Sequence, residues 1–183
     1  MPDIRIVNIV ASASIAPHLG LESISEKIPE VEYDKERFPG IICRIKEPKT
    51  AVLIFSSGKL VCTGGRSMED VRKVIGMITE KLRAVGEDVG ASPEITVQNI
   101  VATCDLKPDH LLKLSQVAIT LGLENVEYEP EQFPGLVYRI AEPKTVTLLF
   151  STGKMVCTGA KNIEDIQKGV EIIANELRMA GFI

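Results

Sequence analysis

The sequence predicts an α+β protein built from two tandem copies of one unit. The segment Tyr33–Gly64 recurs as Tyr128–Gly159 at a constant offset of 95, and 20 of the 32 aligned positions are identical. Near the N-terminus, IRIVNIVAS matches ITVQNIVAT and aligns Asn8 with Asn99. A solenoid normally needs three or more repeats, so two copies are expected to pair as a pseudo-dimer. We expect the repeats to occupy residues 1–90 and 91–183.

Each repeat is expected to run strand, helix, several strands and a final helix. First strands are predicted at Arg5–Ala11 and Thr96–Ala102. Helical spacing predicts a helix over Pro108–Leu121, with Asp105 and the proline itself as start signals. Ala16–Lys27 is its weaker counterpart. The Phe-Pro-Gly, Glu-Pro-Lys and Ser-Gly or Thr-Gly motifs predict the turns between strands.

The final helix of the first repeat is predicted from Ser67, a good N-cap, to a stop at Gly86. The equivalent helix of the second repeat is expected between Asn162 and Gly181. Both carry an apolar stripe at helical spacing. The stripe residues are Val71, Ile75, Ile78 and Leu82 in the first helix and Ile166, Val170, Ile173 and Leu177 in the second.

Composition excludes several classes of protein. The 183 residues are 45% hydrophobic and 25% charged, which is typical of a globular protein. We see no run long enough to span a bilayer and no signal peptide, which predicts the cytoplasm and nucleoid, or the nucleus of a eukaryote. The four cysteines form no CxxC pair and only two histidines are present, so no metal is expected. Cys62 and Cys157 are predicted to be buried thiols. No cofactor is expected.

The net charge of −4 argues against a protein that binds any polyanion. The chain up to Gly90 holds 13 basic and 13 acidic residues, and the rest holds 8 and 12. The whole excess of negative charge therefore lies in the second repeat. If the chain binds DNA, local patches and groove contacts must carry the binding.

We expect no enzymatic activity, and three further features have structural interpretations. Gly64-Gly65 lacks the spacing of a Walker motif and is interpreted as a strand-to-helix turn. His18 and His110 have no evident Cys, Ser or Asp partner for catalysis. Basic residues on the first long helix are interpreted as a solvated face, with a partner site as the alternative. They are Arg66, Arg72, Lys73, Lys81 and Arg83.

The predicted sheet is apolar on both faces. In the strand Ala51–Phe55, Val52 and Ile54 can face the helices while Leu53 and Phe55 face the other way. Two helices per repeat can cover only one face. The second face could pack against a further layer or a second copy, line the cavity of a small-molecule binder or enzyme, or bind a ligand surface.

The repeated phenylalanines favour the interpretation that the second face binds a ligand surface. Four of the five are related by the repeat, and each pair brackets a strand-turn-strand segment, so its members can meet at one edge of the sheet. Bulky wedges at two symmetry-related ends suit insertion between base steps. They are Phe38 with Phe55 and Phe133 with Phe150.

At these residues the chain resembles the TATA-box-binding protein family, archaeal type. The matching motifs are VNIVAS and VQNIVAT, RFPGIICRIKEPKT and QFPGLVYRIAEPKT, and FSSGKLVCTG and FSTGKMVCTG. The resemblance covers essentially the whole chain. It implies a saddle-shaped antiparallel sheet of about ten strands, helices on the convex side and a concave face that binds the minor groove of TATA-box DNA. It also implies a role in transcription initiation.

The resemblance further implies roles for individual residues. The two phenylalanine pairs correspond to DNA-intercalating wedges. Base or groove contacts fall on Asn8, Val10, Leu53, Val61, Thr63, Asn99, Val101, Leu148, Val156 and Thr158. DNA backbone contacts fall on Arg44, Lys49, Ser57, Lys59, Arg139, Lys144, Thr152 and Lys154.

The partners implied are double-stranded A·T-rich promoter DNA, transcription factor B and the RNA polymerase assembly. Glu129 and Glu131 lie in the segment that meets transcription factor B in relatives. Gln132 departs from the apolar residue that relatives often carry at the next position. Self-association through the concave face is a further expectation.

Overall fold

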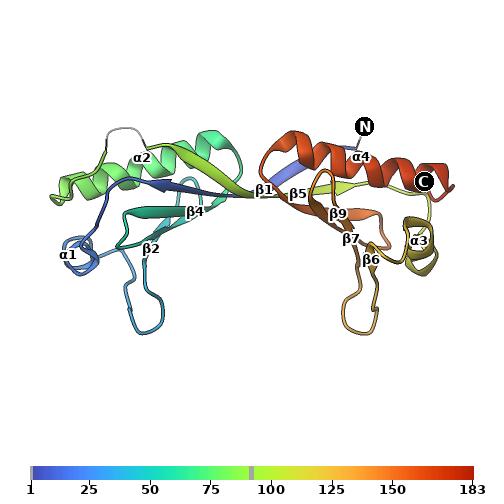
Figure 1. Cartoon of the computed structure of the whole chain (residues 1–183), viewed down its shortest axis with the longest axis horizontal. Helices are drawn as coiled ribbons and strands as arrows, with labels where there is room; N and C mark the ends of the chain where they lie inside the picture. The colour runs from blue at the N-terminus through green and yellow to red at the C-terminus, as the bar shows by residue number, and fades with distance from the viewer. Residues whose placement is uncertain (1, 91–92) are drawn as a thin grey trace. The chain divides into compact units, whose positions relative to one another are not determined.

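The computed structural model describes residues 2–90 and 93–183, which form two compact units. The N-terminal unit is Asn8–Gln98. The C-terminal unit joins the residues up to Val7 with Asn99–Ile183. Each unit combines antiparallel strands with helices, so the predicted α+β class is confirmed (Figure 1).

Within the described residues, the N-terminal unit holds four strands and two helices, together with Ile95–Gln98 at the start of a further strand. Its strands hydrogen-bond in the order β2-β3-β4-β1, and every ladder is antiparallel. The elements are β1 (Ile4–Ser14, of which Asn8 onward belongs here), α1 (Leu21–Lys27), β2 (Ile41–Ile45), β3 (Thr50–Ile54), β4 (Lys59–Gly65) and α2 (Met68–Ala84).

The C-terminal unit repeats this plan with one more strand. Its order is β5-β9-β8-β7-β6, again antiparallel. The elements are β5 (Ile95–Asp105, of which Asn99 onward belongs here), α3 (Leu114–Leu121), β6 (Val126–Glu127), β7 (Leu136–Ile140), β8 (Thr145–Leu149), β9 (Lys154–Ala160) and α4 (Ile163–Met179).

The described residues contain nine strands, in agreement with the predicted sheet of about ten. The second repeat forms the short strand β6, which pairs with β7. The equivalent stretch of the first repeat forms only a single bridge between Glu32 and Ile42. The first strands are longer than predicted, because β1 and β5 continue three residues beyond Ala11 and Ala102.

The predicted starts of the two short helices are wrong. Helix α3 begins at Leu114, not at Pro108. The Asp105 carboxylate accepts from the Lys107 N–H over 2.9 Å, so it closes a turn after β5 and caps no helix. The Leu112 N–H donates to the Ser151 carbonyl over 2.8 Å, which holds this segment along the β8–β9 turn.

A similar backbone hydrogen bond to a turn makes α1 of the N-terminal unit begin later than predicted. The Leu19 N–H donates to the Ser56 carbonyl over 2.9 Å, in the turn between β3 and β4. Helix α1 accordingly begins at Leu21, after Gly20, and not at Ala16. Its predicted end at Lys27 is confirmed.

The two long helices form where predicted. The Ser67 hydroxyl accepts from the Asp70 N–H over 3.1 Å at the start of α2. The Asn162 amide oxygen accepts from the Asp165 N–H over 2.8 Å at the start of α4. Gly86 and Gly181 follow the helices with φ of 93° and 80°. All eight stripe residues are buried.

The core of each unit lies between its sheet and its long helix. Helix α2 packs on β3 and β4, and α4 packs on β8 and β9 (Figure 1). Val52 and Ile54 are buried beneath α2 as predicted, whereas Ala51 and Leu53 on the opposite face stay half-buried. We call this second surface of each sheet its open face.

All four cysteines are buried free thiols, as predicted for Cys62 and Cys157. Burial raises the pKa of each thiol, and that of Cys62 reaches about 11. They are core residues, not nucleophiles. No helix in the described part of the chain has the length and apolar character needed to cross a bilayer.

Candidate nucleic-acid interface

The strand register of the N-terminal unit arranges its open face in two rows. Residues paired across neighbouring strands share a face of the sheet. One row runs Arg44, Ala51 and Thr63, and the next runs Ile42, Leu53, Val61 and Ser12. The predicted contacts Leu53, Val61 and Thr63 therefore lie side by side.

The C-terminal unit reproduces both rows. The first runs Arg139, Val146 and Thr158, and the second runs Val137, Leu148, Val156 and Thr103. Ser12 and Thr103 were not predicted as site residues, because the first strands were expected to end at Ala11 and Ala102. The repeat itself aligns the two hydroxyls and could have indicated them.

A bulge in the sheet fixes the asparagine of each open face. In the N-terminal unit the register of β1 slips between Ile9 and Ala11, so that Thr63 and Gly64 both lie opposite Val10. Gly64 has a φ of 95°, which glycine adopts at no steric cost. Its N–H donates to Asn8 Oδ1 over 2.6 Å.

The C-terminal unit holds its asparagine in the same way. The Gly159 N–H donates to Asn99 Oδ1 over 2.9 Å, and Gly159 has a φ of 97°. Asn99 Nδ2 donates to Thr158 Oγ1 over 3.0 Å. The corresponding Asn8–Thr63 contact measures 3.4 Å. Each amide oxygen is thus engaged by the backbone, while an amide NH2 group carries two hydrogens and keeps one for a ligand.

The four repeated phenylalanines form two edge-to-face pairs. The ring centroids of Phe38 and Phe55 lie 5.7 Å apart at 67°, and those of Phe133 and Phe150 lie 5.9 Å apart at 71°. Phe55 and Phe150 follow Leu53 and Leu148 by two residues and so continue the open face. The structure therefore brings together the two members of each predicted wedge.

The predicted backbone-contacting residues are exposed in both units. Arg44 and Arg139 project from the open faces but are engaged in surface ion pairs. Arg44 lies 3.5 Å from Glu32, and Arg139 lies 3.3 Å from Glu127. Pairs of this exposure contribute only about 0 to 1 kcal/mol, so a polyanion could displace the carboxylates.

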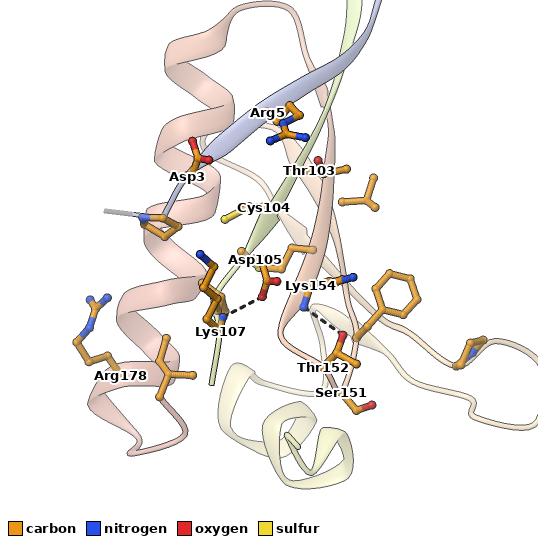
Figure 2. Close-up of a pocket in the computed structure, with 17 residues that line it drawn as sticks. Asp3, Arg5, Thr103, Cys104, Asp105, Lys107, Ser151, Thr152, Lys154 and Arg178 are labelled. Atoms are coloured by element: carbon orange, nitrogen blue, oxygen red, sulfur yellow. Dashed lines mark hydrogen bonds between the residues drawn. The ribbon is translucent and has the colours of Figure 1, made fainter. Parts of the chain in front are cut away.

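An open hollow of about 1090 Å³ lies where β5 ends and β9 begins in the C-terminal unit, and residues of both sides of the sheet line it. Thr103, Val156 and Phe150 line it together with Thr152 and Lys154 (Figure 2). Three further cations at its edge were missed by the sequence analysis. They are Arg5, Lys107 and Arg178.

Two of these cations have no basic counterpart in the other repeat, so the repeat pattern does not indicate them. Arg5 aligns with Thr96, and Lys107 aligns with Ala16. Asp3 and Asp105 also line the hollow and offset part of the charge. The lining of the hollow therefore mixes apolar side chains with charges of both signs.

The loop before each wedge differs between the units. Glu129 and Glu131 are exposed in the loop that leads to Phe133. The Phe133 N–H donates to the Glu129 carbonyl over 2.9 Å, so a backbone turn joins this acidic segment to the wedge residue. Within the described residues, no group of three or more His, Cys, Asp or Glu side chains could hold a metal ion.

The fold and site together define a duplicated α+β protein in which each unit exposes one apolar sheet face with a central Asn–Thr pair and an aromatic pair. The family model described as "Transcription factor TFIID (or TATA-binding protein, TBP)" matches residues 3–85 and 94–180. The chain belongs to the TATA-binding protein family, whose members are DNA-binding transcription factors and not enzymes.

Archaeal relatives match over nearly their full length. The TATA-box-binding protein of Picrophilus torridus is 53% identical over 183 residues, which are 100% of this chain and 98% of the relative. That of Thermoplasma acidophilum is 54% identical over 180 residues, or 98% and 97%. The solved structure of Methanococcus jannaschii TBP matches with a TM-score of 0.88 at 44% identity and covers 97% of this chain and 99% of that one.

Proposed function

We propose that this chain is a general transcription initiation factor that binds the minor groove of TATA-box promoter DNA through the open faces of both units. The observation that carries the proposal is the oriented Asn–Thr pair, set among apolar side chains and present twice. A duplex offers equivalent groups to two related faces. A catalytic site would instead need one polar constellation.

The chemistry of the open faces favours A·T pairs. In the minor groove A·T and T·A present only acceptors, whereas G·C adds the guanine amino donor. Asn8, Asn99, Thr63 and Thr158 supply hydrogen-bond donors for those acceptors. The flat surfaces of Val10, Val61, Leu53 and of Val101, Val156, Leu148 leave a guanine amino group crowded and without a partner.

The aromatic pairs supply one wedge in each unit. Inserting an apolar side chain between base steps unstacks them at a cost of a few kcal/mol per step, and the bent duplex then contacts more protein surface. Pyrimidine–purine steps unstack easily, so a TA step lowers this cost. We infer that Phe38 with Phe55 and Phe133 with Phe150 kink the duplex at two such steps.

Phosphate contacts explain how an acidic protein holds DNA. Local cations act within a Debye length of about 8 Å, so the net charge of −4 matters less than the residues at the groove edge. The candidates are Arg44, Lys49, Lys59, Arg139, Lys144 and Lys154, with the hydroxyls of Ser57 and Thr152.

The proposed partners follow from the acidic loop of the C-terminal unit. Glu129 and Glu131 would recruit transcription factor B, which in turn brings the RNA polymerase assembly to the promoter. The protein would then act on the nucleoid. Free protein would have its apolar open faces available for self-association.

A gel-shift assay with two duplexes of equal length tests the function. One duplex contains a TATA element, and in the other every A·T pair of the element is replaced by G·C. We expect binding of the first at concentrations well below those needed for the second. Equal affinity for both would contradict minor-groove readout. A protein that binds neither duplex but dimerises would point to the open face as a contact between copies.

A further inference from the structure

The rings of Phe133 and Phe150 rest against Gly135. A Cβ atom built on Gly135 would lie 2.8 Å from Cε1 of Phe133 and 3.0 Å from Cε1 of Phe150. Carbon atoms pack at about 3.5 to 4.0 Å, so these rings use the space that a side chain would fill. Gly135 itself is buried, whereas Phe133 is 38% exposed.

We propose that Gly135 is a positioning residue for the aromatic wedge of the C-terminal unit. Its missing side chain lets both rings settle onto the backbone in their edge-to-face arrangement. The inference deepens the proposed function and rests on it, because a wedge matters only if the duplex is kinked. Gly135 itself need not touch the bases.

The backbone of Gly135 does not require glycine. Its φ is not among the positive values found at seven other glycines, so an alanine can adopt the same conformation without strain. The three heavy atoms nearest to an added methyl group, its chain neighbours apart, all belong to the two rings. The ring of Phe133 is partly exposed and can rotate away. The expected response to Gly135→Ala is therefore a displaced wedge and not an unfolded unit.

The equivalent glycine of the N-terminal unit is less suited to the test. A Cβ on Gly40 would meet Phe38 and Phe55 at 3.0 and 3.1 Å, but it would also lie 3.0 Å from the Ile54 carbonyl. Part of the strain would then pass to the backbone of β3. A substitution at Gly135 therefore tests the placement of the wedge with less disturbance of the sheet.

The test compares Gly135→Ala with Gly76→Ala, in the full chain. A Cβ on Gly76, in α2, meets nothing within 4 Å, so this variant adds the same methyl group without touching a wedge. Two TATA duplexes are used. One is fully paired, and one carries a mismatch at both outer base steps of the element, where unstacking needs less energy. Bending is measured by energy transfer between dyes at the duplex ends, and affinity by titration.

We expect Gly135→Ala to bend the paired duplex less than the parent protein and to bind it about tenfold more weakly, because a displaced wedge no longer offsets the cost of unstacking in full. Its affinity for the mismatched duplex should fall much less. Gly76→Ala should match the parent on both. Equal weakening on both duplexes, or unchanged bending, would overturn the role of Gly135.

A second variant covers the case in which Gly135→Ala disturbs folding. Adding Phe133→Leu removes the ring atom nearest the new methyl group and keeps an apolar wedge. The double variant should bend DNA more than Gly135→Ala alone, with Phe133→Leu as the reference that completes the cycle. Absence of this rescue would also count against the proposal. If the parent protein itself neither bends nor prefers the TATA duplex, the proposed function fails, which is a different result.

Discussion

Two asparagine amides are held by the backbone of a neighbouring strand, and this contact determines what they can offer a ligand. Gly64 and Gly159 donate to the amide oxygens of Asn8 and Asn99 over 2.6 and 2.9 Å. An amide whose oxygen is engaged in this way presents its NH2 group as a donor. Acceptor edges such as adenine N3 and thymine O2 are its natural partners.

Asn99→Ala should therefore weaken specific binding far more than nonspecific binding. We expect a loss of about 1 to 3 kcal/mol on a TATA duplex, the size of one good base contact. Titrations of TATA and random-sequence duplexes measure both. Asn175→Ala, an exposed position on α4, is the control and should change neither affinity. An equal loss of affinity for the two duplexes would mean that Asn99 supports the fold or contacts the DNA backbone, and does not read the bases.

Thr147 places a hydroxyl group in the core without a strong hydrogen-bond partner. It is fully buried in β8, and its hydroxyl has no nitrogen or oxygen hydrogen-bond partner among the described residues. Its cross-strand neighbour is Cys157, whose sulfur is only a weak partner. The first repeat carries Val52 at the equivalent position.

Thr147→Val should raise the free energy of unfolding by about 1 to 3 kcal/mol, the cost of an unsatisfied buried group. Urea denaturation measures the change. Thr79→Val is the matched control, since the Thr79 hydroxyl donates to the Ile75 carbonyl over 2.7 Å and its removal should bring no gain. A destabilised Thr147→Val protein would mean that the contact with Cys157 is worth more than the desolvation of the hydroxyl.

At the scale of elements, periodicity and caps predicted what is locally encoded. Both long helices begin and end as their N-caps and glycines indicate, and strand alternation correctly assigned Leu53 to the open face. The starts of α1 and α3 were missed because they depend on bonds to the distant turns at Ser56 and Ser151.

The bulge could not be read from the sequence either, because it is a property of register between two strands. Gly64 and Gly159 look like ordinary turn glycines until β1 and β5 are paired with β4 and β9. The repeat pattern indicates the asparagines and phenylalanines but not Arg5 and Lys107, which do not recur.

Gly159→Ala tests the bulge as a device that orients Asn99. An alanine at a φ of 97° should destabilise the fold by about 1 to 2 kcal/mol. Gly181→Ala, at a φ of 80° with nothing within 4 Å, should cost a similar amount. Only Gly159→Ala should reduce discrimination between TATA and G·C duplexes, measured as the ratio of affinities at a temperature where both variants are folded. The same ratio in both variants would show that the bulge has no part in readout.

At the scale of the whole molecule, charge is distributed unequally between the repeats. The six repeat-related cations are matched in number between the units, whereas the excess of acidic residues lies entirely after Gly90. Phosphate contact should therefore be shared, while partner recognition is free to differ between the two repeats.

Phosphate contacts made by both units predict how the DNA-binding constant depends on salt concentration. If all six cations contact phosphates, log K should fall against log[salt] with a slope of about −5, at roughly 0.9 per phosphate. Replacing Arg44 and Arg139 by glutamine should make the slope less steep by about 2. Titrations over a range of KCl concentrations measure both slopes. A slope near zero for the parent protein would contradict phosphate contact by this set.

Orientation on a promoter is expected to come from the acidic loop. A protein with two similar faces binds a near-palindromic element with weak preference for one direction. A basic partner that docks on Glu129 and Glu131 and also touches flanking DNA would select one direction, because complementary charge sets register and association rate.

Reversal of Glu129 and Glu131 to lysine should leave TATA binding unchanged and impair assembly with transcription factor B, as measured by a supershift of the DNA complex. The equivalent loop of the first repeat provides the matched control: lysine at Asp34 and Glu36 should leave assembly intact, since Lys35 and Arg37 already neutralise that loop. If instead the two double reversals behave alike, the docking site lies elsewhere, and the basic residues Arg72 and Lys73 of α2 become the next surface to test.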